Sequence, residues 1–279
     1  MVEGWEWDDT LFLGAAPYYR RGRLPYAPGF AEVLAEALGL DGRGRLIDVG
    51  CGPGTLALGL VGFFDGVVGV DPDRGMIAEA ERQAAAVGVA ARTRWVRARA
   101  EELPAGLGTF TAATFGQSFH WMDRDLVAAR VRDMLRPGGA LVHVSDLMTE
   151  RLSADGLPYP AVPSAAIGDL TRRYLGPVRR AGRGVLPYGT PGGEAAILTR
   201  AGFTGPRRYV VPGGQALERT RDDITAWVFS LSASAPHLFG ERLGAFTSDL
   251  GRLLREHSAS GRFSERQPST EIFIWHPPA

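Results

Sequence analysis

The sequence predicts an α/β protein with a doubly wound sheet, and three observations support this fold class. Short apolar runs alternate five times with helix-patterned segments over residues 30–146. A glycine-rich loop follows the first apolar run, and an aspartate ends the second. In such a chain, right-handed crossovers place helices on both faces of a mostly parallel sheet.

The expected elements follow one another without a long break up to residue 146. The predicted strands of this part are 46–49, 67–70, 93–98, 111–116 and 140–146, and the predicted helices are 28–40, 55–64, 74–87 and 126–135. This alternation of strand and helix patterns ends at residue 146. Further helical patterns lie at 166–175, 222–235 and 242–258, and strand patterns lie at 207–212 and 269–275. The chain therefore reads as one core with a helical insertion.

Composition limits the chemistry. The formal net charge of the 279 residues is zero, so no overall field draws the chain to nucleic acid or a membrane surface. No stretch approaches the roughly 20 apolar residues of a membrane helix, and the acidic N-terminus does not resemble a secretory signal. We therefore expect a cytoplasmic protein. One cysteine and five scattered histidines give no metal-ligand spacing, and the absence of lysine excludes Schiff-base chemistry.

Gly50, Gly52 and Gly54 stand at alternate positions directly after the first predicted strand. Glycine permits positive φ and leaves no Cβ between the backbone and a ligand. Because ligands of α/β sheets lie beyond the carboxyl ends of the strands, we expect this loop to contact a cofactor. The nicotinamide fingerprint requires glycine where Thr55 stands, and the phosphate-binding Gly-Lys-Ser/Thr sequence is absent.

Asp71 ends the second predicted strand, about 20 residues after the first glycine of the loop. An acid at this point of a nucleotide-binding sheet accepts hydrogen bonds from both hydroxyls of a ribose. The alternative role is capping of the next helix, because Pro72 follows. The order of strand, glycine loop, helix, strand and acid favours the ribose.

Several motifs together resemble the class I S-adenosylmethionine-dependent methyltransferases. The segments that carry the resemblance, in the family's order and spacing, are DVGCGPGT (48–55), VVGVDPDRGMIAEA (67–80), RAEELP (99–104), TFGQSFHWMD (114–123) and MLRPGGALV (134–142). The resemblance implies a Rossmann-like sheet of seven strands whose last strand is antiparallel. It also implies S-adenosyl-L-methionine as cofactor and methyltransferase activity.

The resemblance implies roles for individual residues. Gly50, Cys51 and Gly52 are expected to line the methionine half of the cofactor, above Asp48, which organises the loop. Cys51 is interpreted as a small spacer, because no partner base for a nucleophilic thiol is evident. The other implied contacts are Asp71 and Pro72 at the ribose, Met76 against adenine, Ala100 and Glu101 at the adenine edge, and Gln117 and Ser118 beside the sulfonium. Relatives often carry an aspartate where this chain has Arg99.

His120 is the candidate catalytic residue, since its ordinary pKa suits a base near neutrality. Two other roles remain open for it: a structural histidine, or a cofactor-binding residue that orients the methionine carboxylate. The orienting role is favoured, because an activated methyl group reacts with an aligned acceptor without a protein base. Trp121, next to it, is expected to line the acceptor pocket.

The methyl acceptor is expected to be a small molecule. An Asn/Asp-Pro-Pro-aromatic loop typical of nucleic-acid amino methyltransferases is missing after the fourth strand, and the arginines of 92–99 fit an exposed edge strand. Insertions at 147–200 and 217–262 are expected to roof the site, with Trp227 and Phe229 in the pocket.

The N-terminal segment 1–29 is expected to close over the cofactor. Tyr19 and Arg23 are its candidate cofactor contacts, and Tyr26 is its candidate for the acceptor pocket. The arginine-rich composition suggests bacterial secondary metabolism. An alternative function is binding of S-adenosylmethionine without methyl transfer, as in a cyclisation, and a less favoured one is RNA methylation.

Overall fold

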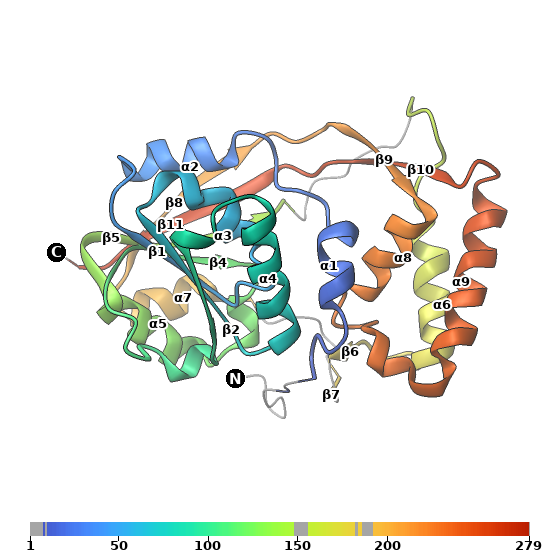
Figure 1. The fold of residues 1–279 in the computed structure, drawn as a ribbon, viewed down its shortest axis with the longest axis horizontal. Helices are drawn as coiled ribbons and strands as arrows, with labels where there is room; N and C mark the ends of the chain where they lie inside the picture. Colours follow the sequence, from blue (N-terminus) through green and yellow to red (C-terminus); the bar gives the residue numbers. More distant parts are fainter. Residues whose placement is uncertain (1–7, 9, 148–155, 182–183, 186–191, 279) are drawn as a thin grey trace.

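The protein consists of an α/β core and a helical cap, with helix α1 (Ala16–Gly22) between them (Figure 1). The structure is a computed structural model that describes residues 8, 10–147, 156–181, 184–185 and 192–278.

The core contains a seven-stranded sheet in the order β3-β2-β1-β4-β5-β11-β8. Its strands are β1 (Arg45–Val49), β2 (Gly66–Asp71), β3 (Thr93–Arg97), β4 (Phe110–Gly116), β5 (Leu135–Asp146), β8 (Thr204–Val211) and β11 (Thr270–His276). The first five strands pair in parallel, whereas β11 is antiparallel to both β5 and β8. This arrangement confirms the predicted sheet and its antiparallel last strand.

The strand order reverses at β1. β2 and β3 follow β1 to one side, and β4 then pairs on the other side of β1. The carboxyl ends of β1 and β4 therefore diverge into a crevice, which is where open α/β sheets bind ligands. The glycine loop at 50–54 leaves β1 at this edge.

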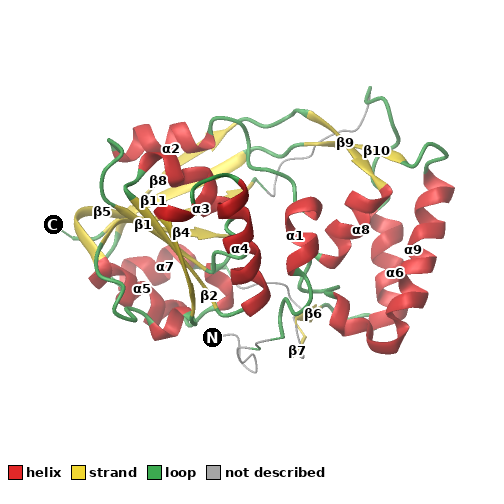
Figure 2. Ribbon diagram, viewed as in Figure 1, coloured by secondary structure: helices red, strands yellow, loops and turns green. Residues whose placement is uncertain are grey.

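Helices cover both faces of the sheet (Figure 2). α2 (Phe30–Leu38) and α3 (Thr55–Leu60) bury Leu34, Leu56 and Leu60 against one face. α5 (Arg124–Met134) and α7 (Glu194–Arg200) pack on the other face with side chains that include Val131, Ile197 and Leu198. Since α7 is part of this core, the insertion expected at 147–200 ends before residue 194.

β3 forms one edge of the sheet, as the alternating arginines of 92–99 predict. Arg94 and Arg97 are exposed on it. The ring of Trp95 lies against Gly69 and Gly54. The strand thus combines charged side chains that discourage edge-to-edge pairing with an aromatic contact to the glycine loop.

The cap has a hydrophobic core of its own. Its helices are α6 (Ser164–Leu175), α8 (Arg221–Phe229), η5 (Pro236–Arg242) and α9 (Leu243–His257). Phe229, Phe239 and Phe246 are buried between them, and the rings of Phe239 and Phe246 stack with centroids 4.0 Å apart. α8 ends at Phe229 instead of residue 235, because the hydroxyls of Ser230 and Ser234 bond to its last carbonyls.

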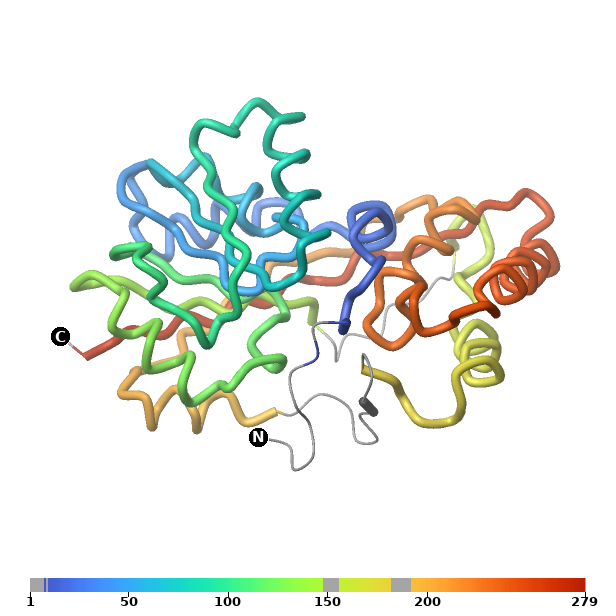
Figure 3. The backbone as a smooth tube through the Cα atoms, turned by 60° about the horizontal axis from the view of Figure 1, so that its bottom comes forward, coloured from blue at the N-terminus to red at the C-terminus, as the bar shows by residue number. Residues whose placement is uncertain are grey.

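A two-stranded sheet that the sequence pattern did not predict joins core and cap. β9 (Ala216–Thr220) and β10 (Arg262–Arg266) pair antiparallel, between the core strands β8 and β11 and the cap helices. The buried guanidinium of Arg219 pairs with Glu265 at 2.8 Å and donates to the carbonyl of Gly22 in α1. Figure 3 shows α1 held between the two parts.

The described residues contain no helix long and apolar enough to cross a membrane. They also contain no group of three or more His, Cys, Asp or Glu side chains arranged to hold a metal ion.

Candidate active site

The three glycines of the loop have different surroundings, and all three have positive φ: +68° at Gly50, +52° at Gly52 and +82° at Gly54. A Cβ on Gly50 would lie 2.6 Å from the Cβ of Ser118, and a Cβ on Gly54 would lie 2.6 Å from the ring of Trp95. A Cβ on Gly52 would meet nothing within 4 Å. Two glycines therefore allow close packing of the protein on itself, whereas Gly52 faces open space.

Asp71 fixes this loop to the end of β2. One carboxylate oxygen accepts the amide of Gly52 at 2.9 Å, and the other accepts the amide of Asp73 at 2.9 Å. Burial raises the pKa of Asp71 to about 6, although these two hydrogen bonds oppose the shift. Asp71 does not cap the next helix. Asp73 does so, by accepting the amide of Met76 at 2.8 Å.

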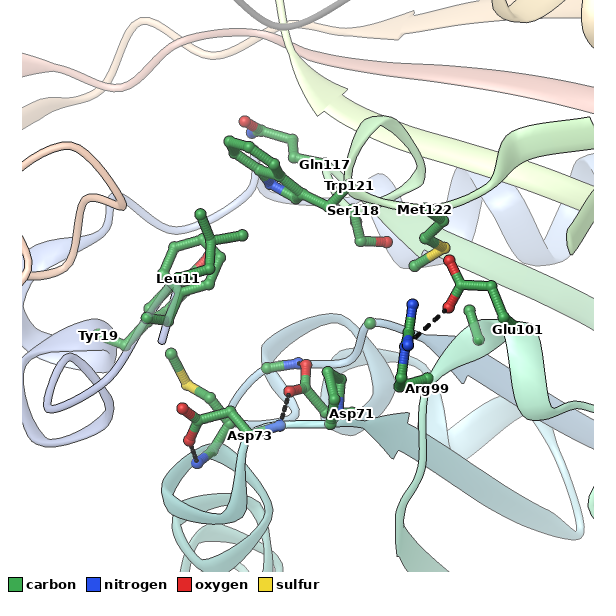
Figure 4. Close-up of a pocket in the computed structure, with 17 residues that line it drawn as sticks. Leu11, Tyr19, Asp71, Asp73, Arg99, Glu101, Gln117, Ser118, Trp121 and Met122 are labelled. Atoms are coloured by element: carbon green, nitrogen blue, oxygen red, sulfur yellow. Dashed lines mark hydrogen bonds and ion pairs between the residues drawn. The ribbon is translucent and has the colours of Figure 1, made fainter. Parts of the chain in front are cut away.

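Gly52 and Asp71 border a cleft at the carboxyl ends of the strands, with a volume of about 720 Å³ that includes space open to solvent (Figure 4). The cleft is lined by residues of the loops after β1, β2, β3 and β4 and of the N-terminal segment. They are Leu11, Phe12, Tyr19, Gly50, Gly52, Asp71, Pro72, Asp73, Met76, Arg99, Ala100, Glu101, Gly116, Gln117, Ser118, Trp121 and Met122.

Most of the residues expected to contact the cofactor line this one cleft. They are Tyr19, Gly50, Gly52, Asp71, Pro72, Met76, Ala100, Glu101, Gln117 and Ser118. Trp121, expected in the acceptor pocket, lines it as well. The parallel sheet brings together loops from Gly50 to Trp121, and α1 adds Tyr19 to them.

Three aromatic rings of the cleft wall contact one another. Phe12 meets Trp121 and Tyr19 edge to face, with ring centroids 6.2 Å and 6.3 Å away. Leu11 and Phe12 were not among the predicted site residues. Their apolar character was visible, but a short apolar pair gives no signal that distinguishes a cleft wall from core.

Glu101 organises the wall formed by the loop after β3. Its Oε1 accepts the amide of Asp123 at 2.8 Å, and its Oε2 lies 3.6 Å from the guanidinium of Arg99. Arg99, which stands where relatives often have an aspartate, itself lines the cleft. The adenine edge of the expected site thus holds an ion pair and not a lone carboxylate.

Gln117 and Ser118 hold the end of β4. Gln117 has a φ of +55°, an unusual value for a residue with a side chain, and its amide donates to Asp146 at 3.3 Å. The hydroxyl of Ser118 donates to the carbonyl of Val49 at 2.6 Å and so ties β4 to the glycine loop. Backbone strain of this kind concentrates at functional sites.

Asp48 and Cys51 do not line the cleft. Asp48 was expected beneath the loop, whereas Cys51 was expected to line the methionine half. Asp48 is 1% exposed and accepts the hydroxyl of Thr114 at 2.8 Å, while its other oxygen has no hydrogen-bond partner. Burial raises its pKa to about 7. The thiol of Cys51 points towards Gly69, and burial raises its pKa well above the ordinary value. A buried, protonated thiol agrees with the spacer interpretation.

His120 also lies outside the cleft lining. Its ring contacts that of Trp121, with centroids 4.8 Å apart. Burial, together with the charges of Arg179 and Arg124, lowers the pKa of His120 to about 4. The sequence placed His120 in the right short segment, but the 3-10 turn η4 (Phe119–Trp121) directs Trp121 into the cleft and His120 away from it.

Arg23 does not reach the cleft either. Its guanidinium lies 4.9 Å from the ring centroid of Tyr19 and donates to the carbonyl of Ser230 at 3.0 Å. Arg23 therefore supports Tyr19 from behind and links it to the end of α8.

The residues expected to line the acceptor pocket lie in different parts of the structure. Tyr26 packs on Phe30, its hydroxyl faces Gly116, and burial raises its pKa well above the ordinary value. Phe229 is 3% exposed inside the cap core, so its assignment to a pocket is wrong. Trp227 lines a second cavity, between α6 and α8. Because α8 packs on both sides, Trp227 points to this cavity and Phe229 points into the cap core.

Comparison with known proteins agrees with the fold and the loop geometry. Residues 46–139 match the sequence profile of a family described as a methyltransferase domain. An uncharacterized methyltransferase of Mycobacterium tuberculosis is 34% identical over 146 residues, which cover 52% of this chain and 56% of the relative. A malonyl-[acyl-carrier protein] O-methyltransferase of Enterobacter lignolyticus is 32% identical over 151 residues, or 53% and 55% of the two chains.

A solved structure supports the fold alone. The YcgJ protein of Bacillus subtilis is similar with a TM-score of 0.51 at 15% identity, covering 89% of this chain and 98% of that one. The fold is thus a doubly wound α/β fold with a cleft at the carboxyl ends of its strands. Residues 46–139 of the chain match a methyltransferase domain. The chain spans about half the length of the curated relatives it matches.

Proposed function

We propose that the protein binds S-adenosylmethionine in the cleft and transfers the methyl group to a small-molecule acceptor. The observation that carries the proposal is the pair formed by Gly52 and Asp71. An open space over a glycine amide, next to a buried carboxylate at the end of β2, matches what a ribose-bearing cofactor requires.

Asp71 has the capacity to hold the ribose. Each carboxylate oxygen already accepts one backbone amide, and each has a further lone pair for a hydroxyl donor. Pro72 and Met76 provide an apolar surface for adenine, and Ala100 with Glu101 offer main-chain groups at its edge. Gly50, Gly52, Gln117 and Ser118 surround the space for the methionine half.

The bound cofactor would supply a methyl carbon activated by positive sulfur. The residues of this chain would then align the acceptor and exclude water. Phe12, Tyr19 and Trp121 form the wall suited to this task. Because the N-terminal segment supplies two of these rings, closure of segment 1–29 over the cofactor is part of the proposal. His120 has no part in it as a proton acceptor.

A small acceptor is favoured by the cap. The cap keeps a separate hydrophobic core and stands beside the cleft, whereas the formal charge of the chain is zero. An extended, positively charged surface for nucleic acid would need a different charge balance. The name of the Enterobacter relative specifies a malonyl group on an acyl-carrier protein, so in that protein a short acyl group is methylated while it is attached to a carrier. Bacterial secondary metabolism remains part of this proposal.

Calorimetric titration with S-adenosylmethionine, S-adenosylhomocysteine and NAD tests the cofactor. We expect the first two ligands to bind and NAD to give no heat. Formation of S-adenosylhomocysteine during incubation with a panel of small acceptors tests methyl transfer. Tight binding of NAD alone would overturn the proposal, and cofactor binding with a changed acceptor but no S-adenosylhomocysteine would indicate a non-methylating reaction.

A further inference from the structure

The cap contains a second cavity, between α6, α8 and the segment 175–180, with a volume of about 800 Å³ that includes space open to solvent. Ile167, Leu175, Trp227, Val228 and Leu231 give it apolar walls. Its size is within the range of small-molecule sites.

The charged residues of this cavity all have the same sign. Arg172, Arg179 and Arg180 line it, and no aspartate or glutamate does so among the described residues. Arg172 pairs with Asp169 on its own helix. In the part of the chain that the structure describes, no ion pair is formed by Arg179 or Arg180. An apolar cavity with two uncompensated guanidinium groups favours an apolar ligand that carries negative charge.

Arg180 gives an independent sign that a partner is missing. Its Nε is buried and has no hydrogen-bond partner. Buried polar atoms are nearly always satisfied, so an acceptor atom of a bound ligand would remove the cost of leaving this donor unpaired.

The cavity adjoins the wall of the cofactor cleft. Ala181, which follows Arg180, packs against Leu11 and Trp121, and both of these residues line the cleft. Arg179 lies near enough to His120 for its charge to act on that ring, next to Trp121. The two arginines therefore lie at the side of the cavity that is nearest to the cleft.

We propose that this cavity binds the apolar body of the methyl acceptor, and that the acceptor is an organic acid whose carboxylate pairs with Arg179 and Arg180. The inference rests on the proposed methyltransferase function and names the substrate class for it. Trp227 supplies the flat apolar surface under the acceptor, while the carboxylate satisfies the buried donor of Arg180.

Calorimetric titration of the whole protein with decanoate tests the inference. Decan-1-ol and decylamine, which have the same chain length, serve as the uncharged and the positively charged comparison ligands. We expect decanoate to bind at least about tenfold more tightly than decan-1-ol, since a charge-assisted pair contributes on the order of 1.5–3 kcal/mol. Decylamine should not bind. Equal affinity of the acid and the alcohol would overturn the assignment of the arginines.

Substitutions of the cavity residues test where decanoate binds. Arg179→Ala and Arg180→Gln should each weaken decanoate binding about tenfold, and Trp227→Ala should weaken the binding of both decanoate and decan-1-ol. Arg173→Ala is the matched control, because Arg173 lies on α6 but lines a separate pocket between α6 and α9. Arg179 is exposed, so its variant tests the proposal even if Arg180→Gln fails to fold. An Arg179→Ala variant that binds decanoate like the Arg173 variant would contradict the proposal.

Titration of S-adenosylhomocysteine into the same variants separates this inference from the function on which it rests. The two ligands should bind together, and Arg179→Ala should leave the cofactor affinity unchanged, because Arg179 does not line the cleft. Displacement of one ligand by the other would place decanoate in the cofactor cleft and overturn the inference. Failure of the wild-type protein to bind S-adenosylhomocysteine would instead overturn the proposed function.

Discussion

The cleft of the core and the interior of the cap use aromatic side chains in opposite ways. In the cleft, Phe12 meets Tyr19 and Trp121 by its edges only, and the rings stand around open space. In the cap, Phe239 stacks on Phe246, and Phe229 closes the group. The same residue types form a binding wall in one place and a core in the other.

The backbone explains the difference. Around the cleft, the chain has positive φ at Gly50, Gly52 and Gln117, and hydrogen bonds of Asp71 and Ser118 hold these turns. The side chains there cannot collapse into the space without breaking those bonds. In the cap, no such bonded turns stand between the aromatic rings, and Phe229, Phe239 and Phe246 approach until they touch.

The largest effect is expected from Phe229→Ala in the cap core. Removing a ring that is 3% exposed should lower the free energy of unfolding by about 3–5 kcal/mol, because a cavity remains. Thermal and urea unfolding measure this, and Phe229→Leu should cost less. If Phe229→Ala were instead stable but raised KM for the acceptor, Phe229 would line a pocket, and the contrast between cleft and cap would fail.

Gly52→Val should abolish most cofactor binding, with a loss of about 100-fold or more, because the side chain would enter the open space of the cleft and resist a φ of +52°. Calorimetry with S-adenosylhomocysteine measures the loss. Gly88→Val is the control, since Gly88 has a φ of +75° and open space but lies away from the cleft. Similar cofactor affinities of the two variants would show that Gly52 does not face the ligand.

Asp71→Ala should weaken S-adenosylhomocysteine binding by about 1–3 kcal/mol, since the ribose hydroxyls lose a charged acceptor. The pH dependence gives a second measurement. Hydroxyls donate to the ionised carboxylate, so wild-type affinity should fall as the pH drops through about 6, the pKa of Asp71. The difference between the wild-type and Asp71→Ala profiles isolates this group. A folded variant of normal affinity would limit Asp71 to holding the loop.

His120→Ala should have the smallest effect, with cofactor affinity changed less than about threefold, because His120 does not line the cleft. The wild-type rate should also show no histidine-like rise near pH 6.5, since the pKa of His120 is about 4. Saturated turnover and cofactor binding of one purified variant check this. A turnover loss of about 10²–10⁴ at normal affinity would restore His120 as a proton acceptor.

The sequence by itself determined the features that depend on local pattern. The alternation of apolar runs specified the sheet, because buried parallel strands and amphipathic helices leave periodic signatures. The loop at 50–54 and Asp71 were recognisable because a tight turn at a strand end requires glycine, and the acid follows at a fixed distance along the chain. Gly50, Gly52 and Asp71 do line the cleft, whereas Cys51, Pro53 and Gly54 do not.

Only the tertiary structure decided which way individual side chains point. Trp121 enters the cleft and His120 does not, although they are neighbours, because successive side chains of a 3-10 helix point about 120° apart. Leu11 joins the cleft wall through contacts with Trp121 and Ala181, which are more than 100 positions away. The strands β9 and β10 form only because residues more than 40 positions apart meet. Such contacts depend on the packing of segments that are distant in the sequence, so the local periodicity of apolar residues does not predict them.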